Sequence, residues 1–253
     1  MSIILTLACN HFCDEPILSN NKLKEELGIS GRNFVMKKYS WNASVCSKDS
    51  IEKFIKRLID ITLGTMYLFL SLPIWIAYYF YIKIVSPGPV IYKMERLGQN
   101  GTTFNMYKFR TMVIDADEKL NEILKIDEKL RKEFNENYKL KSDPRIIKYG
   151  NLFRKFSIDE IPQLINILKG DMSLVGPRPI VKLELEKYEE NKNTFLSVKP
   201  GLTGLWQISG RSELSYDDRI ILDINYIENW SIWMDIEILL KTAKVILTGY
   251  GAV

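Results

Sequence analysis

Adjacent carboxylates at Asp159 and Glu160 are the clearest candidates for catalysis in this sequence. They lie in the segment RKFSIDEIPQ, residues 154–163, in which two basic residues precede them. A carboxylate can attack phosphorus or bind Mg²⁺ while cations hold phosphate oxygens, so the pattern suits phosphoryl chemistry. Ser157 and Glu160 also have the spacing of a helix capping box, and on this segment alone a purely structural interpretation carries equal weight.

Histidine catalysis is nearly excluded, because His11 is the only histidine in the chain and lies outside the expected core. The sequence also lacks the Gly-x-Ser-x-Gly nucleophile motif, the Walker phosphate loop and the Gly-x-Gly-x-x-Gly dinucleotide motif. Any catalysis must therefore use carboxylates and basic residues, with or without a metal ion.

A second polar cluster consists of glycine-rich turns that carry arginine. The turns are GPRP at 176–179, KPGLTG at 199–204 and SGRS at 209–212. Glycine lets backbone N–H groups approach an anion, and arginine can bind phosphate through two parallel hydrogen bonds. Turn formation explains the glycines and prolines but not the repeated arginine, so Arg178 and Arg211 are predicted to contact phosphate. Anchoring its own loop is the alternative role of Arg178.

Length and composition bound the class of protein. The chain has 253 residues, of which 46% are hydrophobic and 26% charged, as expected for one main globular domain. A net charge of +4 is too small to argue for a nucleic-acid partner, but it is compatible with anionic lipid or phosphorylated substrates.

One long apolar segment is predicted to enter a membrane. Residues 61–82 carry no charge, and at 1.5 Å per residue they form about 33 Å of helix, enough to cross a bilayer. Pro73 falls near the middle and should bend the helix, and the Ser71 hydroxyl could satisfy a carbonyl that the proline frees. A buried core helix of a soluble protein is the alternative.

Basic residues flank both ends of this segment, without the one-sided bias of a spanning helix. They are Lys53, Lys56, Arg57, Lys83, Lys93 and Arg96. A re-entrant hairpin, which enters and leaves on the cytoplasmic face, explains both the flanking charges and the proline. A straight span remains open.

The remaining patterns predict a mostly helical α+β fold with a small β-hairpin. The sequence divides into an unassigned N-terminal extension (1–50), a membrane region (51–86) and a catalytic domain on the cytoplasmic face (87–253). Within the last region we expect a β-hairpin (90–92 and 104–109), a charged surface helix (115–140) and two shorter helices (146–156 and 158–168). Residues 220–247 predict one or two amphipathic helices, placed at the membrane interface or in the core.

An ordered series of motifs resembles the monotopic phosphoglycosyl transferases, also called bacterial sugar transferases. The resemblance covers about residues 53–253, and the motifs that carry it are KRLID (56–60), SPGP (86–89), YKFRTM (107–112), DPR (143–145), SIDEIPQ (157–163), LKGDMSLVGPRP (168–179) and PGLTGLWQ (200–207). So long an ordered set is highly specific.

The resemblance implies a membrane enzyme that moves a sugar 1-phosphate from a UDP-sugar to polyprenyl phosphate and releases UMP. By position, Asp159 would be the nucleophile of a ping-pong mechanism and Glu160 would hold Mg²⁺. Candidate contacts with phosphate or nucleotide are Lys108, Arg110, Arg154, Arg178 and Arg211. The helix break would lie at Ser71 and Pro73.

The expected partners are therefore a UDP-sugar, polyprenyl phosphate and the bacterial cytoplasmic membrane, on its cytoplasmic face, in the first membrane step of exopolysaccharide or glycan assembly. A homodimer is compatible with the sequence. The ending GYGAV, residues 249–253, resembles the hexose 1-phosphate transferases of the family, so UDP-galactose or UDP-glucose is the leading donor and an N-acetylated UDP-sugar the second. Two rivals remain: a non-catalytic membrane-anchored adaptor, and a metal-dependent phosphatase that uses the same dyad.

Overall fold

The computed structural model describes residues 29–137, 140, 143–210 and 215–248. His11, Arg211 and the 249–253 ending lie outside these residues, as does most of the predicted N-terminal extension. Internal contacts divide the chain into two units, Met1–Leu58 and Ile59–Val253. The second unit contains every candidate residue that the structure describes.

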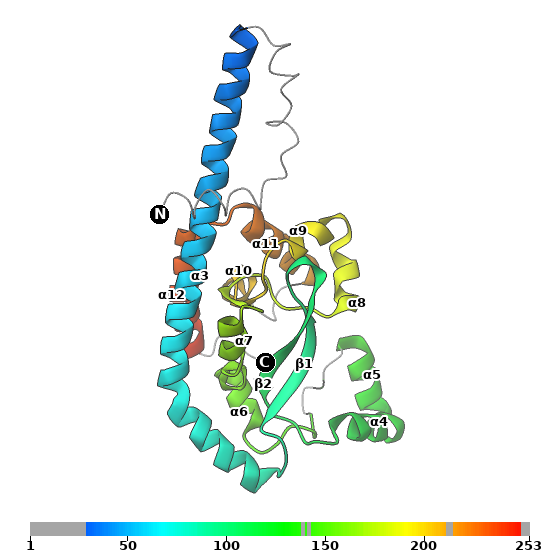
Figure 1. Ribbon diagram of the computed structural model, residues 1–253. Coiled ribbons are helices and arrows are strands. Elements are labelled where there is room, and N and C mark those ends of the chain that lie inside the picture. Colours follow the sequence, from blue (N-terminus) through cyan, green and yellow to red (C-terminus); the bar gives the residue numbers. More distant parts are fainter. Residues whose placement is uncertain (1–28, 138–139, 141–142, 211–214, 249–253) are drawn as a thin grey trace. The chain divides into compact units, whose positions relative to one another are not determined.

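The apolar segment forms part of a single helix, α3 (Ile29–Val85), with Pro73 inside it. The ribbon of α3 bends in its lower part (Figure 1), as expected where proline removes a backbone donor. The Ser71 hydroxyl donates a hydrogen bond of 2.8 Å to the Leu68 carbonyl. Pro73 has no N–H to donate to the carbonyl of Phe69, which is the carbonyl that we expected Ser71 to satisfy. The Ser71 hydroxyl bonds instead to the preceding carbonyl, that of Leu68.

One face of α3, from Asp60 onward, packs on the rest of the second unit. Its buried side chains are spaced 11, 7 and 4 residues apart, which places them on one helix face: Asp60, Ser71, Tyr78 and Ile82. Asp60 accepts hydrogen bonds from the Leu174 amide (2.9 Å) and the Ser173 hydroxyl (3.1 Å). The carboxylate at the start of the apolar segment is therefore fixed to the domain core.

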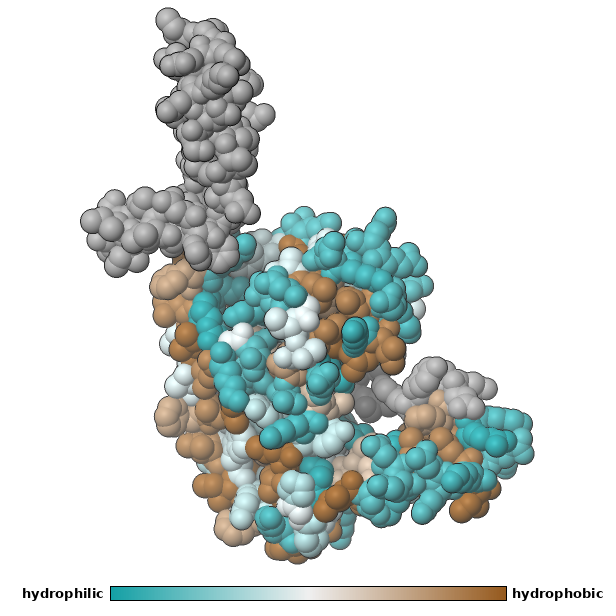
Figure 2. All heavy atoms as spheres, turned by 45° about the vertical axis from the view of Figure 1, so that its right-hand side comes forward, coloured by the Kyte–Doolittle hydropathy of each residue, from teal (hydrophilic) through white to brown (hydrophobic). Residues whose placement is uncertain are grey.

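The other face of α3 exposes large apolar side chains. They include Met66, Phe69, Leu70, Ile76, Phe80 and Ile84, and Figure 2 shows hydrophobic residues gathered along the left edge of the described surface. Only 17% of the most apolar window of this helix is buried, which argues against the core helix of a soluble protein. By length and composition the helix could cross a membrane.

The predicted β-hairpin is confirmed. Strands β1 (Ile91–Leu97) and β2 (Thr103–Phe109) pair antiparallel, with Tyr92 opposite Lys108. The short η1 turn (Gln99–Gly101) joins them, and Asn100 there has a left-handed backbone with φ of 58°. Strand β2 carries Lys108 at its end, next to Phe109 in the core.

Two further strands pair that the sequence analysis did not predict, and the second of them falls in the predicted turn 199–204. Strands β3 (Ser173–Val175) and β4 (Gly201–Thr203) lie parallel. A Cβ atom on Gly201 would lie 2.1 Å from the Gly176 nitrogen, far inside van der Waals contact. Glycine is thus required at this position by the close approach of the two backbones.

The charged segment forms two helices, not one, α4 (Ala116–Ile126) and α5 (Glu128–Asn137). Asp127 separates them, because its Oδ1 accepts hydrogen bonds from the amides of Lys129 and Leu130 at 2.8 and 3.1 Å and so begins the second helix. Helix α4 has no buried residue, which confirms its surface position. The two helices stand at the right of Figure 1.

The two short helices are shorter than predicted. Helix α6 spans Gly150–Lys155, and a single 3-10 turn, η2 (Ile158–Glu160), precedes α7 (Gln163–Lys169). Pro162 lacks the N–H that a continuous helix over 158–168 would use, and it lies at the start of α7 instead. The dyad therefore sits on a tight turn between two helices.

Two C-terminal helices complete the fold, α11 (Tyr216–Glu228) and α12 (Ile232–Thr248). Tyr226 and Trp230 both donate to Asp235, at 2.7 and 3.1 Å, and tie the two helices together. Ile238 is buried whereas Trp233 is 79% exposed, so α12 contributes to the core and also presents an apolar outer side. The smaller elements between are α8 (Lys182–Leu185), η3 (Glu186–Asn191), α9 (Lys192–Leu196) and α10 (Leu205–Ser209).

Candidate active site

The capping-box interpretation of the dyad is wrong. Ser157 precedes η2 with a left-handed backbone, φ 54° and ψ 24°, and its side chain makes no capping hydrogen bond. A non-glycine residue in this region is uncommon and stores a small amount of strain. The sequence SIDE does not serve to begin a regular helix. It forms a sharp turn that presents two carboxylates.

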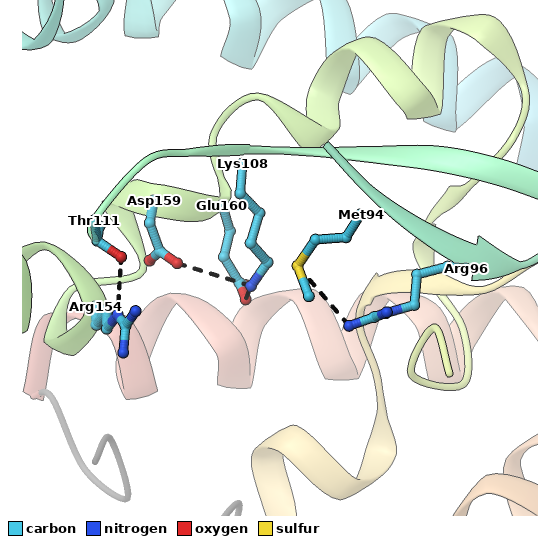
Figure 3. Close-up of polar contacts among 7 residues, drawn as sticks. All are labelled: Met94, Arg96, Lys108, Thr111, Arg154, Asp159 and Glu160. Carbon is cyan, nitrogen blue, oxygen red and sulfur yellow. Dashed lines mark hydrogen bonds and ion pairs between the residues drawn. The ribbon is translucent and has the colours of Figure 1, made fainter. Parts of the chain in front are cut away.

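Lys108 reaches both carboxylates from strand β2 (Figure 3). Its Nζ lies 2.8 Å from Oε1 of Glu160 and 3.8 Å from Oδ2 of Asp159. The side chain of Asp159 is 11% exposed and that of Glu160 is 35% exposed. The inner carboxylate is thus shielded from water, while the outer one remains accessible to a ligand or metal ion.

The environment of Asp159 balances opposing effects on its pKa. Burial raises the pKa of this carboxyl, Lys108 and Arg154 lower it, and Glu160 raises it again. The net result is a pKa above the ordinary value. A buried carboxylate needs neighbouring cations to stay ionised, and Lys108 and Arg154 supply them here.

Arg154 approaches the dyad from helix α6. Its Nε donates a hydrogen bond of 2.9 Å to the Thr111 hydroxyl (Figure 3). Burial lowers the pKa of Arg154, and the charge of Asp159 opposes that effect. The structure therefore brings together Lys108, Arg154, Asp159 and Glu160, four of the residues that the sequence selected.

Arg110 is instead engaged with the turn that follows α3. Its guanidinium donates to the Pro89 carbonyl (2.7 Å), to the Ser86 hydroxyl (2.8 Å) and carbonyl, and to the Met112 carbonyl (3.3 Å). The Arg110 carbonyl accepts from Tyr78 of α3 at 2.8 Å. These bonds join the end of the apolar helix to strand β2, so Arg110 acts as a structural anchor.

Arg178 stands at the edge of the same region. Its Cζ lies 5.2 Å from the centre of the Trp206 ring. Desolvation and the charge of Arg219 lower the pKa of Arg178, and the charge of Glu160 raises it. Arg178 nevertheless has an exposed surface. Arg178 is therefore within electrostatic range of the dyad.

Sequence reasoning missed Arg219. Its Cζ lies 5.5 Å from the centre of the Trp206 ring and 4.9 Å from that of Tyr216. In the sequence it looks like a solvated cation of an amphipathic helix, four residues before Asp223. The sequence offered one signal that Arg219 points inward: Asp223, four residues later, shares the inward face of α11 with Tyr226.

The dyad could supply only some of the ligands of a Mg²⁺ ion. Within residues 29–137, 143–210 and 215–248, no group of three or more His, Cys, Asp and Glu side chains could hold a metal ion. Mg²⁺ commonly binds one or two carboxylates and takes its other ligands from water and substrate phosphates. Glu160, with or without Asp159, fits that requirement.

Comparisons with known proteins agree with these features. The family model described as bacterial sugar transferase matches residues 51–249. The chain is 50% identical over 200 residues to the undecaprenyl-phosphate galactose phosphotransferase of Salmonella typhimurium, which covers 79% of this chain and 42% of that protein. It is 41% identical over 197 residues to the exopolysaccharide production protein ExoY of Rhizobium meliloti, covering 78% and 87%.

A more distant relative is the UDP-glucose:undecaprenyl-phosphate glucose-1-phosphate transferase of Escherichia coli, 36% identical over 200 residues and covering 76% and 40%. The chain thus spans less than half the length of several curated relatives. The matched region contains the dyad turn, the β-hairpin and the arginine-bearing turns described above. This chain belongs to the bacterial sugar transferase family.

Proposed function

We propose that this protein transfers a hexose 1-phosphate from a UDP-sugar to polyprenyl phosphate, giving a polyprenyl diphosphate sugar and UMP. The observation that carries the proposal is the shielded Asp159, held beside Lys108 on the turn that the family motif encodes. The names of the Salmonella and Escherichia coli relatives describe undecaprenyl-phosphate sugar phosphotransferases, which supports this reaction type.

The proposed reaction has two steps. In the first, a carboxylate oxygen of Asp159 attacks the β-phosphorus of the UDP-sugar, an Asp–O–P bond forms, and the bond from that phosphorus to the bridging oxygen breaks, so UMP leaves. In the second, a phosphate oxygen of the lipid attacks the same phosphorus and the Asp–O–P bond breaks. The acyl phosphate is reactive enough to pass its group on, and Asp159 is regenerated.

Cations near the dyad would offset the repulsion between the Asp159 carboxylate and the diphosphate. Lys108 and Arg154 lower the pKa of Asp159 and so favour the ionised nucleophile. Glu160 would hold Mg²⁺, which when bound supplies charge neutralisation at the phosphate oxygens. Arg178 adds a cation on the side of Trp206.

The donor that we favour is UDP-galactose or UDP-glucose. The printed names of relatives from Salmonella typhimurium, Erwinia amylovora and Escherichia coli refer to galactose, UDP-galactose and UDP-glucose. A panel that includes N-acetylated UDP-sugars tests this choice directly.

We also propose that α3 is embedded in the cytoplasmic membrane as a re-entrant helix, with the catalytic domain on the cytoplasmic face. Exposed apolar side chains on one face of α3, the internal Pro73 and basic residues at both ends support this arrangement. A site beside such a helix would let a soluble nucleotide sugar meet a lipid phosphate.

Nucleotide release by the detergent-solubilised protein tests the function. With Mg²⁺, polyprenyl phosphate and a UDP-hexose, we expect many turnovers of UMP from the wild type and none from Asp159→Asn. Release of UDP would mean direct glycosyl transfer, and release of inorganic phosphate without a lipid product would mean a phosphatase. No nucleotide from any donor, with the variant and wild type alike, would support the adaptor.

A further inference from the structure

A group of buried polar atoms near Arg178 lacks hydrogen-bond partners. Within the described residues these atoms are the Trp206 Nε1, the Tyr216 hydroxyl, the Nε and Nη2 of Arg219, and the Gln207 Oε1. In the part of the chain that the structure describes, the one other such atom is the Trp75 Nε1. Buried polar groups in folded proteins are normally paired, and an unpaired one indicates a bound water, ion or ligand. The four on Trp206, Tyr216 and Arg219, whose side chains contact one another, therefore call for a common explanation.

Arg219 lies at the centre of this group. Its guanidinium contacts the Trp206 and Tyr216 rings, at 5.5 and 4.9 Å from their centres. The nearest carboxylate oxygens, on Glu184 and Asp223, are both 3.8 Å away, which is too far for a hydrogen bond. A side chain that is only 11% exposed thus keeps donors that no side chain satisfies.

The orphaned atoms are nearly all donors. An indole N–H and two guanidinium nitrogens can only donate, and a phenol can donate. Arg178 adds a second guanidinium on the Trp206 ring, at 5.2 Å, and Lys187 lies 4.1 Å from the Tyr216 ring centre. A donor-rich, cationic group of this kind complements an anion with several acceptor oxygens.

The two carboxylates in this region do not supply that anion. Burial raises the pKa of Asp223 to about 6, and its Oδ2 already accepts from the Tyr188 hydroxyl at 2.8 Å. Glu184 lies on α8 at the edge of the group, with its side chain 38% exposed. A further oxyanion from outside the protein therefore fits the remaining donors.

We propose that Arg178, Arg219, Trp206 and Tyr216 form a binding site for a phosphate monoester, adjacent to the Lys108–Glu160 pair. The identity of the molecule that bears this phosphate rests on the proposed function. The proposed reaction contains two phosphate monoesters, the departing UMP and the polyprenyl phosphate acceptor. Arg178 belongs to this site through its contact with the Trp206 ring, and the charge of Glu160 raises its pKa. A nucleotide and a lipid phosphate present the same group of oxygens, and the two are separated by experiment.

Phosphate binding by the full chain in detergent, measured by calorimetry in EDTA, tests the site. The ligands are inorganic phosphate, UMP and farnesyl phosphate. The variants are Arg219→Gln, Tyr216→Phe, which removes only the hydroxyl, and Trp206→Phe, which keeps an aromatic ring but removes the Nε1 donor together with part of the ring system. Arg131→Gln is the matched control, because Arg131 is 54% exposed on α5.

We expect inorganic phosphate to bind the wild type, and the affinity to fall about tenfold or more in Arg219→Gln. Trp206→Phe and Tyr216→Phe should each weaken binding several-fold, and Arg131→Gln should not change it. Tighter binding of UMP than of farnesyl phosphate would assign the site to the nucleotide, and the reverse order would assign it to the lipid.

Two results would overturn the inference. One is unchanged phosphate affinity in both Trp206→Phe and Tyr216→Phe, together with a raised melting temperature of Tyr216→Phe, since removing an unused buried hydroxyl is stabilising. The other is an affinity for inorganic phosphate with none for either ester. Binding that depends on Arg219 in a protein that turns over no UDP-sugar would leave this site standing while rejecting the proposed function. Turnover of a UDP-sugar without phosphate binding that depends on Arg219 would support the proposed function and reject this site.

Discussion

Lys108 and Glu160 are separated by 52 positions in sequence, yet Nζ of Lys108 lies 2.8 Å from Oε1 of Glu160. The lysine comes from the end of strand β2 and the glutamate from the η2 turn (Figure 3). This ion pair joins the β-hairpin to the turn that carries the dyad. Nζ of Lys108 also lies 3.8 Å from Oδ2 of Asp159. A single cation serves both carboxylates.

Replacing Lys108 with Met should lower kcat/KM for UMP release by about 100-fold or more, because a cation that stabilises charge at the reacting group is lost in a shielded site. The melting temperature should change little by comparison, since Lys108 is partly exposed. Lys119→Met is the control, as Lys119 pairs with Asp115 on the surface. Equal activity of Lys108→Met and wild type would remove Lys108 from the mechanism.

Gly201→Ala should destabilise the domain by about 1–3 kcal/mol. The added Cβ would meet the Gly176 backbone at 2.1 Å, so strands β3 and β4 must separate. Gly64→Ala is the matched control, because a Cβ there makes its nearest contact at 3.4 Å with a flexible Leu168 side chain. Thermal melting of the two variants in detergent measures the difference, and equal melting temperatures would contradict the close pairing.

Asp223 should make stability depend on pH. Burial raises its folded-state pKa to about 6, above the value near 3.9 of an unfolded aspartate. Between those two values the folded state binds more protons than the unfolded state, so this group stabilises the fold as pH falls from about 6 to about 4. The contribution is lost as pH rises through 6.

Melting curves of the wild type and Asp223→Asn across pH 4–8 isolate this effect. Asparagine keeps an acceptor for Tyr188 and cannot ionise, so the difference in melting temperature between the two proteins should grow in favour of the variant as pH rises from about 4 to about 6, and stay constant above that. Parallel curves at all pH values would show that Asp223 is not the titrating group.

The re-entrant arrangement predicts that both ends of the apolar segment face the cytoplasm. Single cysteines at Lys56 and Lys93, in a chain whose Cys9, Cys13 and Cys46 are replaced by serine, should both resist an impermeant maleimide in intact spheroplasts. Both should react after lysis. Labelling of only one position in intact cells would establish a straight span instead.

Sequence reasoning found the elements whose signals are local. The hairpin over β1 and β2 and the charged surface helices follow from alternation and helical period, and the dyad follows from two adjacent acids after two bases. It also placed Lys108 and Arg154 at the site through the family motifs. The bent apolar helix was visible in its length and in Pro73.

Other features depend on contacts between distant segments. The parallel pairing of β3 with β4 joins two strands of three residues each, which leave no periodic signal. The SIDE sequence mimics a capping box, and only the left-handed backbone of Ser157 shows that it is not one. Arg110 and Arg219 are both basic residues in plausible positions, and their different roles emerge only from what surrounds each guanidinium.

A single-turnover experiment on Asp159 tests the central claim most directly. Protein mixed with radiolabelled UDP-hexose and Mg²⁺, without lipid acceptor, should release one equivalent of UMP per active site and retain the labelled phospho-sugar, which polyprenyl phosphate then removes. Asp159→Asn should show neither the burst nor the label, while keeping its fold. A burst and label that persist in Asp159→Asn, or UMP release that requires the acceptor from the first turnover, would contradict a covalent phospho-aspartate.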